Sequence, residues 1–454
     1  MEKTLSSRTL VGIELNQTHH PEPEGIPLLT HIPESLEALA RHVFQNAPKL
    51  KKAEHVLLLE GGSQYRALNY FTDCLEQAFT LRGHHTRRFN LHQNPNAPQQ
   101  IDDAIKNFKP TFLISFNGMA EAIELSNRKT LGEHLKVPTI SWYVDHPFVQ
   151  YPRVMDHDYP YKINAHFATE GFDNLAKRME WHKLKAFNTK LHAAGFPDFK
   201  TTKPYGERSI RVLVPCSFTP YHEKRQQFKL DKFPSFNRLC QDTIDYLIAS
   251  PEHPADTFFL DGLERLGINP LEVHAMHYCK FLPWIYHCTE MYWREKLLKA
   301  AKNIELTLCG SGWDKADFIS DKWTVHPPTD AYTLAEWYGD SQYVWNICPL
   351  VPRSVHDRMA FCTANGANLV TEPKEWTQSY FGDALIYMPQ EPSVVEETWL
   401  QLLNRPIEAQ AEQANFAQRF TLTNRTYLNS VLDIEAILDR FALRQALAKE
   451  VFPL

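Results

Sequence analysis

The stretch covering residues 342–389 constrains the fold more than any other part of the chain, because it has the pattern of a parallel α/β unit. It reads as strand, polar loop, short helix, strand, helix and strand. The short helix holds Arg358 and Met359, and Asn365-Gly366 is expected to end it because both residues tolerate positive φ. In such a unit, strand ends and helix N-termini lie at one edge, where anions bind.

The same alternation runs through most of the chain and stops twice. Residues 198–209 are polar and interrupt it, and residues 235–302 read as a helical insertion. Two successive α/β halves predict two facing Rossmann-like domains in an α/β fold. Strands are expected near 55–60, 111–115, 139–144, 165–168, 211–214, 304–309, 323–326, 343–348, 368–371 and 384–388.

A chain of 454 residues is too long for one ordinary core, which favours this division into domains. The hinge is expected near 200–208, where the pattern is lost. The predicted parts are an N-terminal extension (1–50), an acceptor-side domain (51–204), a donor-side domain (205–425) that contains the insertion 235–302, and a C-terminal helix (426–454) that packs back on the first domain.

Composition excludes several classes of protein. A net charge of −6 is unlike that of a typical nucleic-acid binder, which is usually strongly basic. No apolar run is long enough for a transmembrane helix, and no signal-peptide core is visible near the N-terminus. The eight cysteines form no C-x-x-C pair, which favours reduced thiols. We therefore expect a cytoplasmic protein without a transmembrane segment.

Several short motifs in the second half occur in the order and spacing of a known enzyme group. Together they resemble the donor-sugar half of GT-B glycosyltransferases, and most closely the CgeB-like (spore-maturation type) group. The resemblance covers roughly residues 110–440. It is carried by Asn346 and Pro349 after a buried strand, by Arg358, Ala364 and Gly366, by Thr371 and Glu372, by the run 306–313 that ends in Gly310-Ser311-Gly312-Trp313, and by Arg425-Thr426-Tyr427.

The resemblance implies a glycosyltransferase that takes a sugar from a nucleotide-sugar donor and gives it to a protein or glycan acceptor. It implies no cofactor and no metal requirement, while the net charge gives no indication of a nucleic-acid partner. Many retaining GT-B enzymes carry two glutamates eight residues apart in this region. Counted back from Gly366, those positions are Arg353 and Phe361, so this chain lacks both carboxylates.

Candidate donor-binding residues follow strands of the second half, where a diphosphate would bind. Glycines after a strand let the backbone approach a phosphate, although a plain tight turn has the same sequence. Arginine binds phosphate oxygens bidentately, although a solvated loop or a charged helix start is the alternative for each basic residue. The candidates are Gly310, Ser311, Gly312, Trp313, Arg353, His356, Arg358, Ser217, Arg225 and Glu372.

Candidate catalytic residues follow a strand of the first half. Asp145 or His146 could deprotonate an acceptor hydroxyl, whereas an Asp before a Pro-containing loop also caps turns. If one of them is the base, the reaction should invert the anomeric centre. Gly61, Gly62, Ser63 and Asn117 also follow strands of this half, and we expect them to shape the acceptor cleft.

A group of histidines and cysteines in the insertion has the composition of a metal site. Its spacing matches no standard zinc pattern, and the neighbouring aromatic residues favour a packed helix. We therefore expect no metal there. The group consists of His274, His277, Cys279, His287 and Cys288.

Two other functions remain open from the sequence. An epimerase or hydrolase on the same scaffold would also bind a nucleotide-sugar but would need no acceptor. A non-catalytic nucleotide-sugar-binding protein would explain the missing glutamates at positions 353 and 361.

Overall fold

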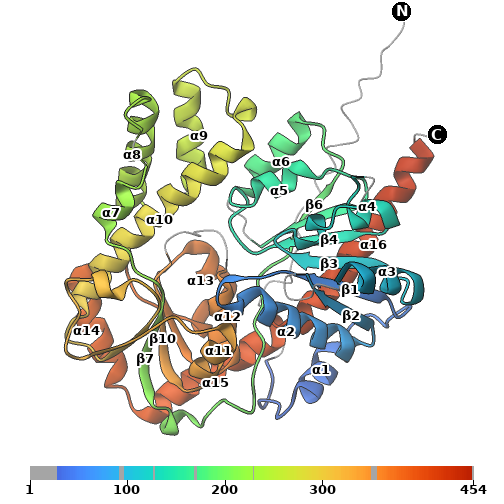
Figure 1. The fold of residues 1–454 in the computed structure, drawn as a ribbon. Coiled ribbons are helices and arrows are strands. Elements are labelled where there is room, and N and C mark those ends of the chain that lie inside the picture. Colours follow the sequence, from blue (N-terminus) through green and yellow to red (C-terminus); the bar gives the residue numbers. More distant parts are fainter. Residues whose placement is uncertain are drawn as a thin grey trace, which may run out of the picture.

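The computed structural model describes residues 28–91, 97–125, 128–167, 171–228, 230–348 and 355–451. Two six-stranded sheets, parallel throughout, form the centres of two domains (Figure 1). The prediction of two Rossmann-like domains is confirmed. The predicted boundary at 204/205 lies between the last strand of the first sheet and the first strand of the second.

The first sheet has the strand order β2-β1-β3-β4-β5-β6. Val56 and Leu58 of β1 pack in the same cluster as helix α2, while Leu57 and Leu59 pack with α3 on the other face. This is why β1 reads as a continuous apolar run. The strands are β1 (His55–Glu60), β2 (His85–Asn90), β3 (Phe112–Phe116), β4 (Thr139–Tyr143), β5 (Lys162–His166) and β6 (Phe187–Lys190).

The second sheet has the order β12-β11-β10-β7-β8-β9. The chain moves outward from β7 through β8 to β9, and then returns to β10 on the other side of β7. The order therefore reverses between β7 and β10. The strands are β7 (Ile210–Pro215), β8 (Leu306–Cys309), β9 (Trp323–His326), β10 (Ser341–Asn346), β11 (Asn368–Thr371) and β12 (Ile386–Tyr387).

Helices cover both sheets, and their ends follow local sequence signals. The Ser35 hydroxyl accepts the Ala38 N–H at the start of α1, and Gly83 ends α2 with φ +103°. The helices of the first half are α1 (Leu36–Phe44), α2 (Ala67–Arg82), α3 (Ala97–Asn107), α4 (Leu131–Leu135), α5 (Tyr151–Asp156) and α6 (Phe172–Trp181). Those of the second half are α7 (Tyr221–Arg225), α8 (Pro234–Ala249), α9 (Ala255–Arg265), α10 (Ala275–Ala300), α11 (Ala331–Gly339), α12 (Asp357–Ala364), α13 (Glu375–Phe381), α14 (Pro392–Leu403), α15 (Ile407–Asn424) and α16 (Tyr427–Val451).

The helical insertion consists of α8, α9 and α10, and it packs against the first domain (Figure 1). One buried cluster combines its side chains with Phe148, Tyr151 and Leu175 of the first domain. Arg178 of α6 is 1% exposed and donates hydrogen bonds to the backbone oxygens of Pro270 and Val273. The insertion therefore joins the two domains.

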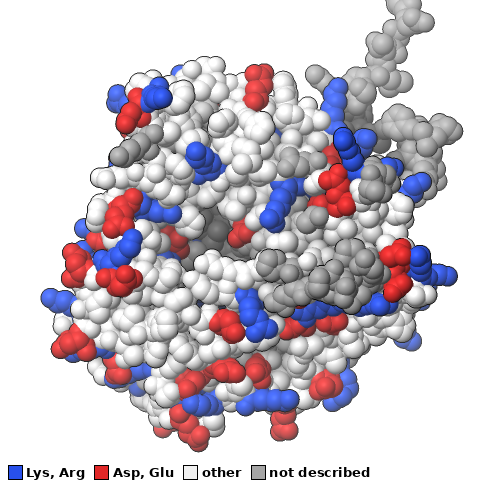
Figure 2. All heavy atoms as spheres, in the orientation of Figure 1, with Lys and Arg blue, Asp and Glu red and all other residues white. Residues whose placement is uncertain are grey.

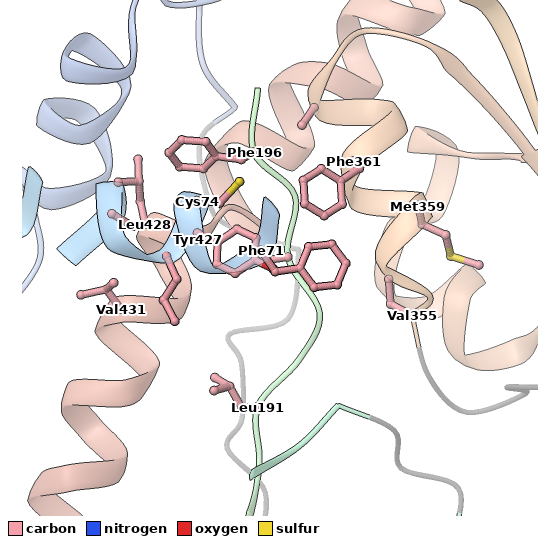
Figure 3. Close-up of a cluster of buried hydrophobic side chains, with 14 of the residues drawn as sticks. Phe71, Cys74, Leu191, Phe196, Val355, Met359, Phe361, Tyr427, Leu428 and Val431 are labelled. Atoms are coloured by element: carbon pink, nitrogen blue, oxygen red, sulfur yellow. The ribbon is translucent and has the colours of Figure 1, made fainter. Parts of the chain in front are cut away.

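The last helix, α16, crosses from the second domain back to α2 of the first, as predicted (Figure 1). Figure 3 shows the buried contact beside this crossing, in which Phe71 of α2, Phe361 of α12 and Tyr427 of α16 meet. The rings of Phe71 and Phe361 are stacked, with centroids 5.5 Å apart. Within the described residues, no helix is both long and apolar enough to cross a membrane.

Candidate active site between the two domains

The face of the molecule is hollowed between the two domains (Figure 2). Open α/β sheets bind ligands beyond the C-terminal ends of their strands, where the strand order reverses. In the second sheet this point lies between β7 and β10, which end at Pro215 and Asn346. A ligand site is therefore expected among the residues that follow these two strands.

Two loops after β7 and β8 fit closely against each other. A Cβ atom on Gly310 would lie 2.1 Å from the Cys216 carbonyl oxygen, and one on Gly312 would lie 2.1 Å from that of Phe218, so only glycine fits. The hydroxyls of Ser217 and Ser311 are 3.0 Å apart. Trp313 lies below them, 3% exposed, with its indole N–H donated to the Cys216 carbonyl. The two loops thus place two serine hydroxyls side by side, while Trp313 is buried and supports the loop after β7.

Arg358 lies at the reversal point of the second sheet. It is in the first turn of α12, which His356 caps by accepting the Arg358 N–H at its Nδ1. The Arg358 Nη1 donates to the Asn346 Oδ1 at 2.6 Å, at the end of β10. Burial raises the pKa of the Cys216 thiol after β7, and the charges of Arg294 and Arg358 oppose this shift. Both arginines are therefore close to the two strand ends.

Helix α10 contributes three polar residues at four-residue spacing: Tyr286, Glu290 and Arg294. Arg294 donates from Nη1 to the Ser217 carbonyl and from Nη2 to Glu290 at 2.5 Å. Burial alone would raise the pKa of Glu290, but Arg294, His287 and Arg358 together outweigh it, and the pKa falls to about 2. Glu290 and Arg294 were not among the residues expected from the sequence, although their four-residue spacing on a mostly apolar helix was a signal for them.

The histidines and cysteines of the insertion have structural positions. His274 caps α10, His287 contacts Glu290 at 3.1 Å, and Cys288 is fully buried. Among the described residues, no group of three or more His, Cys, Asp or Glu side chains could hold a metal ion.

In the first domain, Asp145 and Asn117 come together at the ends of β4 and β3. The Asp145 Oδ2 accepts hydrogen bonds from the Asn117 Nδ2 at 2.9 Å and from the Gln150 Nε2 at 2.7 Å. Asn117 accepts the Val144 N–H with its own side-chain oxygen, at 3.0 Å. No hydrogen bond from the described part of the chain reaches the Asp145 Oδ1. One oxygen of a half-buried carboxylate therefore remains able to accept a proton.

His146 is next to Asp145 but has different hydrogen bonding. Its Nδ1 accepts the Phe148 N–H at 3.3 Å, and its Nε2 is 3.1 Å from the Tyr286 hydroxyl of α10. Burial lowers the pKa of His146 to about 3, so the ring is neutral and Nε2 carries the proton. Both nitrogens are engaged, and the side chain links the first domain to the insertion.

Several other residues that the sequence suggested for the site form hydrogen bonds within the chain itself. Glu372, 4% exposed, accepts the Cys348 N–H at 2.9 Å and the Thr371 hydroxyl at 3.0 Å, which ties β10 to β11. Arg225 binds Gln241, Tyr221 and Asp245, and so holds α7 on α8. Arg353 lies outside the described residues.

The remaining candidates are at the end of β1 and in α12. Ser63 accepts the Leu68 N–H at 3.0 Å near the start of α2, and a Cβ atom on Gly61 would lie 2.7 Å from the Met119 sulfur. Gly62 is exposed. Phe361, at one of the two glutamate positions, is buried against Phe71 and faces the interdomain core.

Several solved structures are similar to the chain. Sucrose-phosphate synthase from Thermosynechococcus elongatus is 11% identical, with 86% of this chain and 100% of that chain covered and a TM-score of 0.46. An α-glucosyltransferase in complex with UDP and DNA is 12% identical, with 86% and 100% covered and a TM-score of 0.45. HepE from Anabaena in complex with UDP-glucose is 9% identical, with 84% and 99% covered and a TM-score of 0.43. Because these TM-scores lie below 0.5, the fold assignment rests on the strand order described above.

Sequence comparison adds information on the second domain. A search of curated proteins finds no match to the chain. Residues 293–436 match a family model described as "Glycosyl transferase-like". This region includes Arg294, the 310–313 loop, Asn346 and Arg358. Strand β10 and helix α12, on one side of the reversal point, therefore lie in a region similar in sequence to that family, while β7 lies outside it.

Proposed function

We propose that this protein is a glycosyltransferase that moves a sugar from a nucleotide-sugar donor to a protein or glycan acceptor. The observation that carries the proposal is the position of Arg358, held by Asn346 where the strand order of the second sheet reverses. This arginine lies within the region that matches the glycosyl transferase-like family. We further propose the CgeB-like group of GT-B enzymes, because of the motifs around Arg358 and Gly310.

The donor diphosphate would lie against the second domain. Departure of a nucleoside diphosphate builds negative charge, which a positioned arginine stabilises through charge-assisted hydrogen bonds. Arg358 would provide these, and the Ser217 and Ser311 hydroxyls would bind further phosphate oxygens. Arg294 adds a second positive charge beneath the same loop. We propose that these groups replace a divalent cation, so that transfer needs neither metal nor cofactor.

Asp145 would be the general base on the acceptor side. Its Oδ1 would take the proton of the acceptor hydroxyl while the acceptor oxygen forms a bond to the anomeric carbon. The bond from that carbon to the donor phosphate oxygen would break, and the nucleoside diphosphate would leave with the electron pair. This single displacement inverts the anomeric centre. His146 would position the strand end through Tyr286 rather than transfer a proton.

We place the activity in the cytoplasm. All eight cysteines are free thiols, which is usual for proteins in a reducing compartment. Secretion in an oxidised form with mixed disulfides would contradict this placement, and fractionation of cells that express a tagged chain would test it.

A panel of nucleotide-sugars, screened by thermal unfolding, tests the proposed function. A donor that binds the folded state should raise Tm with its concentration. The same shift should be much smaller for Arg358→Gln and unchanged for Arg238→Gln, because Arg238 is an exposed residue of α8 that forms an ion pair with Asp242. Activity should survive EDTA.

The best donor should then be incubated with and without acceptor candidates. Turnover without acceptor would favour a hydrolase or epimerase. Binding with no turnover under any condition would favour a binding protein, an outcome with which the burial of Phe361 is compatible. No binding to any nucleotide-sugar would overturn the proposal.

A further inference from the structure

Arg425 is a buried charged residue that the proposed site does not use. It lies between α15 and α16, where its carbonyl accepts the Gly195 N–H at 3.0 Å. The residue is 4% exposed, and its guanidinium carbon lies 3.9 Å from the centre of the Tyr380 ring. The Tyr380 ring thus covers one face of the guanidinium and leaves the N–H groups at its edge to form hydrogen bonds.

Two nitrogens on one side of the guanidinium, Nε and Nη2, are buried and make no hydrogen bond to the described part of the chain. These two atoms form one side of the guanidinium and can bind both oxygens of a carboxylate or phosphate together. Arg82 shows this use in the same protein, since its Nε and Nη2 donate to the two carboxylate oxygens of Glu435 at 2.8 and 3.0 Å.

The chain places an acid near Arg425 but does not pair the two. Asp433 has a pKa raised to about 6, because burial outweighs the charges of Arg425 and Arg440. Burial also lowers the pKa of Arg425 to about 9. No ion pair within 4.0 Å joins Arg425 to any carboxylate of the described chain. Leaving buried N–H groups of a cation without hydrogen bonds is unfavourable, which favours a partner for this edge from outside the described chain.

A row of aromatic rings leads from the first domain to this arginine. His192, which follows β6, contacts Trp376 with centroids 5.6 Å apart, and Trp376 stacks on Tyr380 at 5.4 Å. Trp376 and Tyr380 are half-buried and belong to α13, which follows β11 of the second sheet. The arginine therefore lies at the junction of both domains and of the crossing helix.

We propose that the Nε and Nη2 edge of Arg425 binds one oxyanion group, a carboxylate or a phosphate-type anion, supplied by a ligand that is not part of the described chain. The site uses none of the residues proposed to bind the donor, and it does not depend on the proposed function. Its selectivity should follow from shape, because two parallel N–H groups match two oxygens of one group and not a spherical ion.

Thermal unfolding at constant ionic strength tests this site with three anions: inorganic phosphate, acetate and chloride. Phosphate or acetate should raise the Tm of the wild-type protein in a saturable way, and the stronger of the two identifies the kind of group. Chloride should have no such effect. Arg425→Lys keeps the charge but loses the paired N–H groups, so its apparent affinity should fall at least tenfold. Arg358→Gln should keep the response, which separates this site from the proposed donor site.

Three results would overturn the proposal: an equal response to chloride, an unchanged response in Arg425→Lys, or no response to any anion. Asp433→Asn checks whether Asp433 is the true partner. If the two form an ion pair in solution, this variant should gain an anion response that the wild-type protein lacks.

If Arg425→Lys does not fold, a crystal structure of the wild-type protein soaked in selenate gives a second readout. Anomalous density within hydrogen-bond distance of Nε and Nη2 would support the site. Water alone at both atoms would refute it.

Discussion

Two adjacent residues at the end of β4 differ in what their hydrogen bonds leave available. Asp145 keeps one carboxylate oxygen outside its network with Asn117 and Gln150. His146 uses both nitrogens, and burial keeps its pKa at about 3. We expect Asp145→Asn to lower the turnover of sugar transfer by about 10² or more with donor affinity unchanged. His146→Gln should lose less than tenfold. Steady-state kinetics with a known acceptor measure both, and the reverse ranking would assign the base to His146.

Arg358 is the residue on which donor binding should depend most. Replacing it with alanine would remove the proposed charge-assisted contact to phosphate, and we expect at least a tenfold loss of donor affinity, about 1.4 kcal/mol. Asn346 fixes the guanidinium, so Asn346→Leu should show part of the same loss. Isothermal titration with the donor measures both variants. An Arg358→Ala protein that folds and binds normally would remove this arginine from the site.

At the scale of single elements, α10 contains a buried ion pair whose contribution to the free energy of unfolding can be measured. Glu290 and Arg294 form a mostly buried pair, with 12% and 5% of their side chains exposed. Removing one partner leaves a buried charge, so we expect Glu290→Leu or Arg294→Leu to lower the free energy of unfolding by roughly 3–5 kcal/mol. The double variant should recover most of that stability, because an apolar pair of similar size often replaces a buried ion pair without loss. Urea unfolding measures all three, and a double variant less stable than both single ones would contradict this view.

Individual strands and helices differ in how well they could be predicted from the sequence. Buried central strands such as β1 and β10 have apolar runs, and these were located to within a few residues. β2 (HTRRFN) and β6 (FNTK) were missed because they are edge strands with partly exposed, polar side chains. The helix around Arg358 and its end at Asn365-Gly366 were predicted, since capping and positive φ are encoded locally.

The candidate site was less predictable, because its parts depend on which elements meet in space. Gly310 and Gly312 could be singled out from their place after a strand. The engagement of Glu372 with the Cys348 N–H, and that of Arg225 with Asp245, depend on tertiary contacts that no local pattern reports. Arg294 belongs to the site only because a helix of the insertion reaches the Ser217 loop.

For the whole molecule, buried histidines make stability depend on pH. His166 is fully buried, neither of its ring nitrogens makes a hydrogen bond within the described residues, and burial, Lys162 and His146 lower its pKa to about 3. Between pH 6.5 and 3 the unfolded chain binds a proton at this residue that the folded chain does not, so stability falls as pH falls. The contribution of one such histidine at pH 5 is about 2 kcal/mol relative to pH 7.5.

The variant His166→Phe tests this contribution, because it keeps a ring against Tyr143 and Phe172 but cannot titrate. We expect its free energy of unfolding to fall less between pH 7.5 and pH 5 than that of the wild-type protein. Urea unfolding at the two pH values gives the comparison. Equal pH dependence in both proteins would show that His166 is protonated in the folded state.

The insertion, α16 and the contact between Phe71 and Phe361 all join the two domains through residues outside the linker between β6 and β7, although Phe196 of the linker also packs against Tyr427. We therefore expect an unbroken backbone at the linker to be dispensable once the protein has folded. A protease site placed at Gly206, whose surroundings are open, should allow the chain to be cut into two pieces that still co-elute in gel filtration and separate only in denaturant. Such a two-piece protein would allow each half to be isotopically labelled or replaced separately, and pieces that separate in plain buffer would show that the linker is needed.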